Sequence, residues 1–228
     1  MTKSPDLARG RGFVVLYPVF LKLRGRSVLV VGAGNVAASK LGPLLRAGAR
    51  VDVVALSVSR AVRDLAAAGA LTLHERAFEG SDVDGRLLVV AATNDHEVNA
   101  LVRRSCMARG VLINAVDDPE NCDFYVPAVV DRGQVQVAIS TQGASPALVR
   151  ILREEVERVL HPSIGRCAEV MAAARERIRA MVPDFEGRRA ANDAVARSRV
   201  RELLEQGDEA GARAEVESVL AQVAGKQR

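Results

Sequence analysis

The first half of the chain alternates between short runs of β-branched and leucine residues and longer amphipathic stretches. The apolar runs predict five strands, at Ser27 to Val31, Val51 to Ala55, Leu71 to Glu75, Leu87 to Ala91 and Val111 to Ala115. Helical spacing between them predicts helices over Val36 to Ala47, Ser59 to Ala68 and His96 to Arg109, each followed by a glycine. Strands that alternate with crossover helices indicate an α/β fold with a parallel, Rossmann-like sheet. Pro43 lies inside the first predicted helix, where we expect a kink.

The pattern changes after Asn121. Two strand-like runs, Phe124 to Val130 and Gln134 to Ser140, flank Asp131-Arg132-Gly133 and predict a hairpin. Because an isolated hairpin is barely stable in water, we expect these strands to pair with a second copy of the chain. The remaining sequence predicts helices that begin at Pro146, with Ser145 as N-cap, and continue over Ser163 to Met181, Arg188 to Gln206 and Ala210 to Ala224.

These patterns divide the chain into successive parts. Residues 1–12 are expected to be a flexible tail, and residues 13–116 a dinucleotide-binding, Rossmann-like domain. Residues 117–145 are expected to form a small central β dimerisation domain. Residues 146–228 complete the chain as a C-terminal helical domain.

A glycine-rich turn, Gly32-Ala33-Gly34-Asn35-Val36-Ala37, follows the first strand directly. In such a G-x-G-x-x-A sequence the first glycine permits a tight turn, the second admits a pyrophosphate, and the small alanine lets the helix pack closely. The turn therefore predicts dinucleotide binding, and the residues expected to hold the cofactor are Gly32, Gly34, Asn35 and Val36.

The choice of dinucleotide is left open by the second strand. Many NAD-binding domains end this strand with an acidic residue for the ribose, and that place falls near Ala55 here. No acid stands there, Asp52 lies within the strand, and no arginine is present at the expected strand end to bind a 2′-phosphate.

Polar residues also follow the fourth and fifth predicted strands. Thr93 and Asn94 are candidate cofactor contacts or, equally well, the N-cap of the helix that begins near His96. Asp117 is expected at the same edge of the sheet, near the nicotinamide, although Asp117-Asp118-Pro119 is also a good turn sequence.

Composition narrows the classes of ligand. The net charge of +4 and the pI near 9.3 suit a polyanionic ligand, but an aromatic content of 3% and the lack of a Lys/Arg stripe argue against nucleic acid. The widely spaced Cys106, Cys122 and Cys167 favour neither a disulfide framework nor a metal site, which indicates the reducing cytoplasm. No apolar segment approaches the roughly 18 residues that span a membrane.

Several motifs resemble one family in order and spacing. The bifunctional precorrin-2 dehydrogenase and sirohydrochlorin ferrochelatase of siroheme synthesis, and the N-terminal half of siroheme synthase, are similar at Tyr17 to Leu21, Val28 to Ala37, Ala91 to Thr93, Asn114 to Pro119, Phe124, Pro127 and Ser140 to Pro146. The methyltransferase half of the fused enzyme has no counterpart, so we expect the stand-alone form.

This resemblance implies an NAD-dependent homodimer that oxidises precorrin-2 to sirohydrochlorin, with ferrous iron insertion as an additional activity of the family. It implies that Asp117, in the N-x-V-D pattern, is the catalytic residue. Ser140, Thr141, Gly143 and Ser145 match the family's loop before the first C-terminal helix, where we expect the carboxylate-rich substrate to bind. The family has a serine with a regulatory role where Thr141 stands.

Two other interpretations stay open at this point. In the first, the chain is a non-catalytic NAD-sensing module whose helical tail binds a partner. An unrelated small-molecule dehydrogenase would need a Lys, His or Tyr proton donor near the nicotinamide, and the sequence offers none that is well placed.

Overall fold

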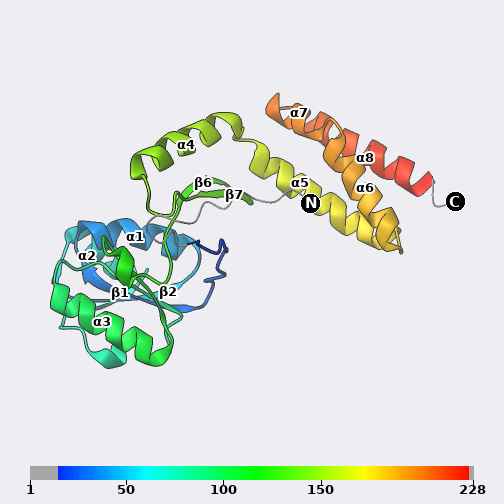
Figure 1. Ribbon diagram of the computed structural model, residues 1–228. Coiled ribbons are helices and arrows are strands. Elements are labelled where there is room, and N and C mark those ends of the chain that lie inside the picture. Colours follow the sequence, from blue (N-terminus) through cyan, green and yellow to red (C-terminus); the bar gives the residue numbers. More distant parts are fainter. Residues whose placement is uncertain (1–14, 226–228) are drawn as a thin grey trace, which may run out of the picture. The chain divides into compact units, whose positions relative to one another are not determined.

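The computed structural model describes residues 15–225, so the tail predicted over residues 1–12 lies outside the described part (Figure 1). The chain divides into two compact units, Met1–Val126 and Pro127–Arg228. The first unit therefore includes residues 117–126, which follow the domain boundary expected from the sequence. No helix among the described residues is long and apolar enough to cross a membrane.

The first unit is built on a parallel sheet with the strand order β3-β2-β1-β4-β5. Its strands are β1 (Ser27–Ala33), β2 (Arg50–Val58), β3 (Thr72–His74), β4 (Leu88–Ala91) and β5 (Leu112–Ala115). The predicted Rossmann-like sheet is thus confirmed, and β2 is longer at its carboxyl end than the apolar run suggested. The extension arises because Val58 pairs with Ala33 across a register shift in β1.

Helices cover both faces of this sheet, as buried parallel strands require. The helices α1 (Asn35–Arg46) and α2 (Arg60–Ala67) pack on one face through Leu41 and Val62, over Val28 and Val30 of β1. The helix α3 (His96–Arg109) packs on the other face, against the alternate residues of β1. Successive side chains of a single strand therefore point to opposite faces of the sheet and belong to two separate hydrophobic cores.

The predicted helix ends agree with the structure. Gly48, Gly69 and Gly110 have φ values of +76°, +71° and +64°, in the left-handed region that glycine adopts readily after a helix. The helix α1 continues through Pro43 to Arg46, so the proline does not end it.

The second unit begins with a two-stranded antiparallel hairpin, β6 (Ala128–Arg132) and β7 (Val135–Ile139). The hairpin itself was predicted, but its boundaries were wrong. Arg132 pairs with Val135, so the turn is Gly133-Gln134, and β6 starts at Ala128 rather than at Phe124. The start is later because the Phe124 carbonyl accepts a hydrogen bond from the Asn114 amide and thus belongs to the first unit.

The rest of the second unit is helical, as predicted. Its helices are α4 (Pro146–Val159), α5 (Ile164–Met181), α6 (Phe185–Arg197), α7 (Val200–Glu205) and α8 (Glu209–Gly225). The single helix predicted over Arg188 to Gln206 is wrong, because it begins earlier and is broken. Asp184 caps α6 by accepting a hydrogen bond from the Gly187 N–H, and Ser198 ends α6 with an extended backbone.

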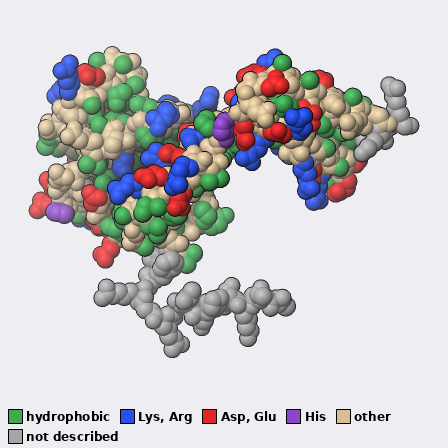
Figure 2. All heavy atoms as spheres, turned by 90° about the horizontal axis from the view of Figure 1, so that it is seen from above, with side chains coloured by type: hydrophobic (Ala, Val, Ile, Leu, Met, Phe, Trp, Pro, Cys, Tyr) green, Lys and Arg blue, Asp and Glu red, His purple; other side chains and the backbone are tan. Residues whose placement is uncertain are grey.

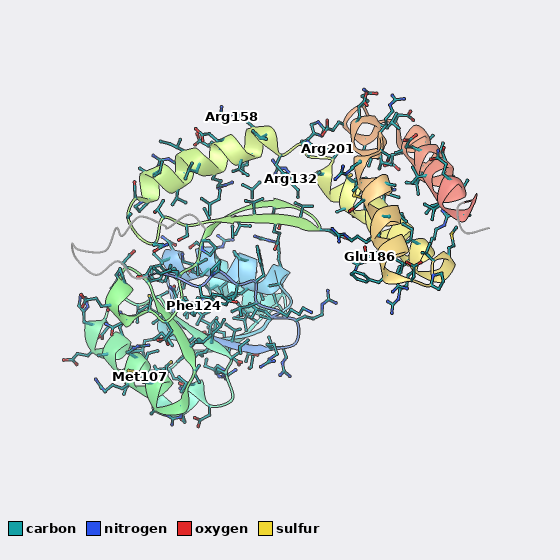
Figure 3. The ribbon with its side chains drawn as sticks, turned by 45° about the vertical axis from the view of Figure 1, so that its right-hand side comes forward. Met107, Phe124, Arg132, Arg158, Glu186 and Arg201 are labelled. Atoms are coloured by element: carbon teal, nitrogen blue, oxygen red, sulfur yellow. The ribbon has the colours of Figure 1, made fainter. Side chains whose placement is uncertain are left out.

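Polar contacts join the elements of this unit. Arg132 of the hairpin donates to the carbonyls of Leu160 at 3.3 Å and Glu157 at 3.4 Å, at the end of α4 (Figure 3). Ion pairs of Arg166 with Glu209 and of Arg177 with Glu217 link α5 to α8, and Figure 2 shows acidic and basic side chains mixed on the visible face of these C-terminal helices. Such exposed pairs contribute little to stability, because solvent screens the charges.

Candidate active site

Three loops meet at the carboxyl edge of the parallel sheet. They follow β1, β4 and β5, which are neighbours in the sheet. The Ala92 N–H donates to the Val31 carbonyl at 2.8 Å, and the Val116 N–H donates to the Ala91 carbonyl at 2.9 Å. The structure therefore brings the glycine turn, the Thr93 loop and the Asp117 loop to one edge, where open α/β sheets bind ligands.

The two glycines of the turn have different surroundings. Gly32 has φ +102°, and a Cβ on it would lie 2.4 Å from the Ala92 carbonyl oxygen, so close packing of β1 on the β4 loop requires glycine. A Cβ on Gly34 would meet nothing within 4 Å. The space over Gly34 is open to a ligand.

The start of α1 is suited to a phosphate group. Asn35 and Val36 are exposed, the N-cap Gly34 has no side chain, and the first turn carries no acidic residue. The free N–H groups and the helix dipole therefore favour an anion here. Ala37 is fully buried, as close packing of the helix on the sheet requires.

After β4, the side chain that caps α3 is Asp95. Its Oδ1 accepts hydrogen bonds from the N–H groups of Glu97 and Val98 at 2.9 and 3.1 Å. The interpretation of Thr93 and Asn94 as the N-cap is therefore wrong. The Thr93 hydroxyl accepts a hydrogen bond from the Asp95 N–H, and Asn94 is exposed.

Asn99 is a residue of this loop that sequence reasoning missed. Its Nδ2 donates to the Thr93 carbonyl at 3.0 Å, and its Oδ1 is buried without a partner among the described residues. Its position on the inner face of the helix after a capping aspartate was the available signal. Asn99 fixes the backbone of Thr93 from the first turns of α3.

Asp117 lies at the tip of the loop that follows β5. Its φ of +61° lies in the left-handed region, which aspartate adopts more readily than most residues other than glycine but which is still uncommon. The side chain is exposed, and its carboxylate forms no hydrogen bond or ion pair with any other residue between 15 and 225. Strained residues of this kind cluster at functional sites.

The turn itself is stabilised by the neighbouring aspartate. The Asp118 carboxylate accepts a hydrogen bond from the Asn121 amide at 2.7 Å, beside the short 3₁₀ turn Pro119–Asn121. Asp117 contributes its backbone to the preceding turn, which the Asp118 N–H closes by donating to the Ala115 carbonyl at 3.3 Å. Its carboxylate takes no part in these contacts and is available to a ligand.

The residues near the end of β2 bear on the choice between NAD and NADP. Asp52 binds Arg86 and His74 with its carboxylate and does not reach the strand end, so the acid for the ribose is indeed missing. The strand end near Ala55 has no arginine either, but β2 continues beyond it to Val58. Arg60 follows two residues later, with a side chain that is 94% exposed and only a 3.8 Å ion pair to Asp64.

The predicted substrate loop lies in the second unit. Ser145 caps α4 by accepting a hydrogen bond from the Leu148 N–H, and the Thr141 hydroxyl bonds both the N–H and the carbonyl of Ser145. Gln142 and Gly143 have φ values of +56° and +84°. The hydroxyls of Thr141 and Ser145 thus make hydrogen bonds that stabilise the loop itself. Binding of substrate by Ser140, Thr141, Gly143 and Ser145 stays a prediction.

The sheet and the glycine turn define a Rossmann-type dinucleotide-binding protein, to which a helical second unit is appended. Family models described as NAD(P)-binding, as sirohaem biosynthesis protein central, and as sirohaem synthase dimerisation region match residues 19–128, 132–158 and 163–228. The chain belongs to the siroheme synthase family.

Known relatives agree with this assignment. The chain is 40% identical over 204 residues to a siroheme synthase of Thioalkalivibrio sulfidiphilus and 43% identical over 190 residues to one of Methylococcus capsulatus. These matches include 90% and 83% of the chain, but it spans only 42% and 40% of those relatives. A solved structure titled SirC, precorrin-2 dehydrogenase, superposes with a TM-score of 0.71 and 27% identity, covering 91% of this chain and 98% of that one.

Proposed function

We propose that this chain oxidises precorrin-2 to sirohydrochlorin with NAD as the hydride acceptor. The observation that carries the proposal is the free Asp117 carboxylate at the same sheet edge as the glycine turn. The oxidation transfers a hydride to NAD and releases a proton. A carboxylate beside the nicotinamide end of the dinucleotide is suited to accept that proton.

The solved relative supports the substrate. Its title names precorrin-2 dehydrogenase, and the superposition covers 98% of that chain. In our proposal Gly32, Gly34, Asn35 and Val36 hold the pyrophosphate, and Thr93 and Asn94 contact the nicotinamide half. The reaction would take place in the cytoplasm.

A direct assay tests this function. The purified chain, mixed with precorrin-2 and NAD, is expected to form NADH and sirohydrochlorin in equal amounts, measured by absorbance. NAD binding without NADH formation, together with no change in Soret absorbance on titration with sirohydrochlorin, would favour the non-catalytic NAD-sensing module instead.

Insertion of ferrous iron into sirohydrochlorin is a second candidate activity. It is favoured by the relatives named siroheme synthase, because siroheme contains iron and the similarity includes most of this chain. Iron is then a substrate rather than a resident cofactor. Adding ferrous iron to the same assay separates the activities, since siroheme and sirohydrochlorin have different absorbance spectra.

We further propose that Arg60 gives the site a measurable affinity for NADPH beside the proposed NAD. No acid is present to repel a 2′-phosphate, and the exposed guanidinium follows the end of β2. Arg60→Ala is expected to weaken NADPH binding about tenfold, the loss typical of one charge-assisted hydrogen bond, and to leave NADH binding unchanged.

Titration of nicotinamide fluorescence measures both affinities, and the chain contains no tryptophan to interfere. Arg63→Ala is the matched control, because Arg63 lies one turn along α2 and is paired with Glu75 at 2.6 Å. An equal loss of NADH and NADPH affinity in Arg60→Ala would contradict selection at the 2′ position.

The second unit supports a homodimer through its central elements. The helix α4 has no buried residue, and its apolar side chains Leu148, Ile151 and Val159 are 46%, 49% and 79% exposed. The hairpin beside it has only two strands, so both of its edges lack a partner strand within the second unit. We propose that a second copy of the chain covers these surfaces.

Ile151→Glu is expected to convert the dimer to a monomer, because it places a charge in the apolar interface. Light scattering after size-exclusion chromatography gives the mass directly. Arg150→Glu introduces the same residue on the opposite face of α4 and is expected to remain dimeric. A dimer of unchanged stability in Ile151→Glu would remove α4 from the interface.

A further inference from the structure

The thiol of Cys122 closes the loop that carries Asp117. Its Sγ lies 3.1 Å from the Ala115 carbonyl oxygen and 3.3 Å from the Asp118 carbonyl oxygen. These two carbonyls flank Asp117 on either side. The S–H group is therefore shared between the carbonyls of Ala115 and Asp118, on either side of the residue that bears the exposed carboxylate.

A buried amide orients this thiol. Asn114 is only 8% exposed, and its Nδ2 donates to Cys122 Sγ at 3.4 Å and to the Phe124 carbonyl at 2.9 Å. Phe124, labelled in Figure 3, follows the loop directly. The sulfur accepts from Asn114 on one side, so its hydrogen is left to point toward the loop carbonyls.

The thiol remains protonated at neutral pH. Burial raises the pKa of the Cys122 thiol, and the nearby carboxylates of Asp118 and Asp123 also raise it. A protonated sulfur is a donor and a thiolate is not. The protonated thiol is therefore a donor to these two carbonyls in addition to the backbone N–H groups of Asp118 and Asn121.

The base of the loop is held independently of the thiol. Asp123 accepts a hydrogen bond from the Ile113 N–H at 3.0 Å and forms an ion pair with Arg103 at 2.7 Å, while its own N–H donates to the Ile113 carbonyl at 2.7 Å. These contacts fix the end of the loop whether or not position 122 is a cysteine. What the thiol adds is restraint on the tip.

We infer that Cys122, oriented by Asn114, is a positioning residue that holds Asp117 in its left-handed conformation. Asp117 has φ +61°, a strained value that the chain relaxes unless its neighbours restrain it. Backbone hydrogen bonds from the Asp118 N–H to the Ala115 carbonyl and from the Asn121 N–H to the Asp118 carbonyl also close this turn. The S–H group adds a second restraint on the same two carbonyls, and without it the backbone of Asp117 samples other φ values and its carboxylate is less well placed at the edge of the sheet. The inference rests on the proposed function, which gives Asp117 its part in the reaction.

Kinetics of Cys122→Ala test the inference in the full chain. We expect kcat for precorrin-2 oxidation to fall about tenfold, which corresponds to one neutral hydrogen bond, with the affinity for NADH unchanged. Cys122→Ser keeps a donor of similar size and is expected to recover most of the lost kcat. An unchanged kcat in Cys122→Ala, or no recovery in Cys122→Ser, would overturn the inference.

A matched control distinguishes positioning from general packing. Cys106 is fully buried on α3 among apolar residues, and burial raises the pKa of its thiol to about 11. Cys106→Ala is expected to lower the melting temperature without lowering kcat at a temperature where the variant is folded. A fall in kcat equal to that of Cys122→Ala would assign both effects to packing and overturn the inference.

A double variant separates this inference from the proposed function. If Cys122 acts through Asp117, adding Cys122→Ala to Asp117→Asn lowers kcat no further, whereas a further tenfold loss would overturn the inference. Full activity of Asp117→Asn alone would instead refute the chemistry proposed for Asp117. The two failures are therefore distinguishable in one set of assays.

Discussion

Asp117→Asn is expected to lower kcat for NADH formation by at least about a hundredfold, the lower end of what a positioned acid or base contributes. Asparagine has nearly the same shape, and it tolerates the left-handed backbone that Asp117 adopts. The loop should therefore keep its conformation while losing the group that takes up a proton. NADH affinity should remain that of the original chain, because the pyrophosphate site is on another loop.

Asp118→Asn is the control for this experiment, since it removes the neighbouring carboxylate from the same loop. The Asp118 carboxylate accepts the Asn121 amide at 2.7 Å, and the oxygen of an asparagine can accept the same bond. We expect activity close to that of the original chain. If Asp117→Asn is as active as Asp118→Asn and the original chain, the exposed carboxylate has no part in the reaction.

The sheet and the edge that carries the site were predictable because their causes are local. Short apolar runs set β1 and β4, and glycines that adopt positive φ, such as Gly110, end the helices. Parallel strands place their carboxyl ends together, so residues after different strands meet without any knowledge of side-chain contacts. The prediction that the glycine turn and Asp117 share one edge follows from topology alone.

What the sequence did not reveal depends on contacts through space. The length of β2, and with it the place of Arg60, depends on the pairing of Val58 with Ala33 across a register shift. The contacts of Cys122 join residues at both ends of a loop that has no regular period. A lone cysteine gives no signal in sequence, and its geometry becomes informative only beside the backbone of Asp117.

The predicted boundaries of the hairpin and of the helix over Arg188 to Gln206 were wrong for a related reason. Phe124 belongs to a strand-like apolar run, but the Asn114 amide holds its carbonyl in the first unit. Ser198 has no strong helix-breaking tendency, yet its hydroxyl donates to the Val195 carbonyl at 2.8 Å where α6 ends. In both cases a single side-chain hydrogen bond overrides a weak local preference.

Gly32→Ala is expected to lower the free energy of unfolding by about 3 kcal/mol or more, because two costs combine. The φ of +102° is strained for alanine, and the added Cβ would lie 2.4 Å from the Ala92 carbonyl oxygen. That oxygen belongs to the backbone of the β4 loop, so it cannot swing aside as a flexible side chain would. Urea unfolding measures the loss.

Gly34→Ala separates folding from binding at the same turn. Its φ is −77°, and a Cβ there meets nothing within 4 Å, so the free energy of unfolding should change by less than about 1 kcal/mol. The methyl group would nevertheless occupy space over the start of α1 that the pyrophosphate needs, and NADH affinity should fall at least about tenfold. Unchanged NADH binding in a folded Gly34→Ala variant would mean that the dinucleotide does not approach this turn, and the assignment of the cofactor site would have to be abandoned.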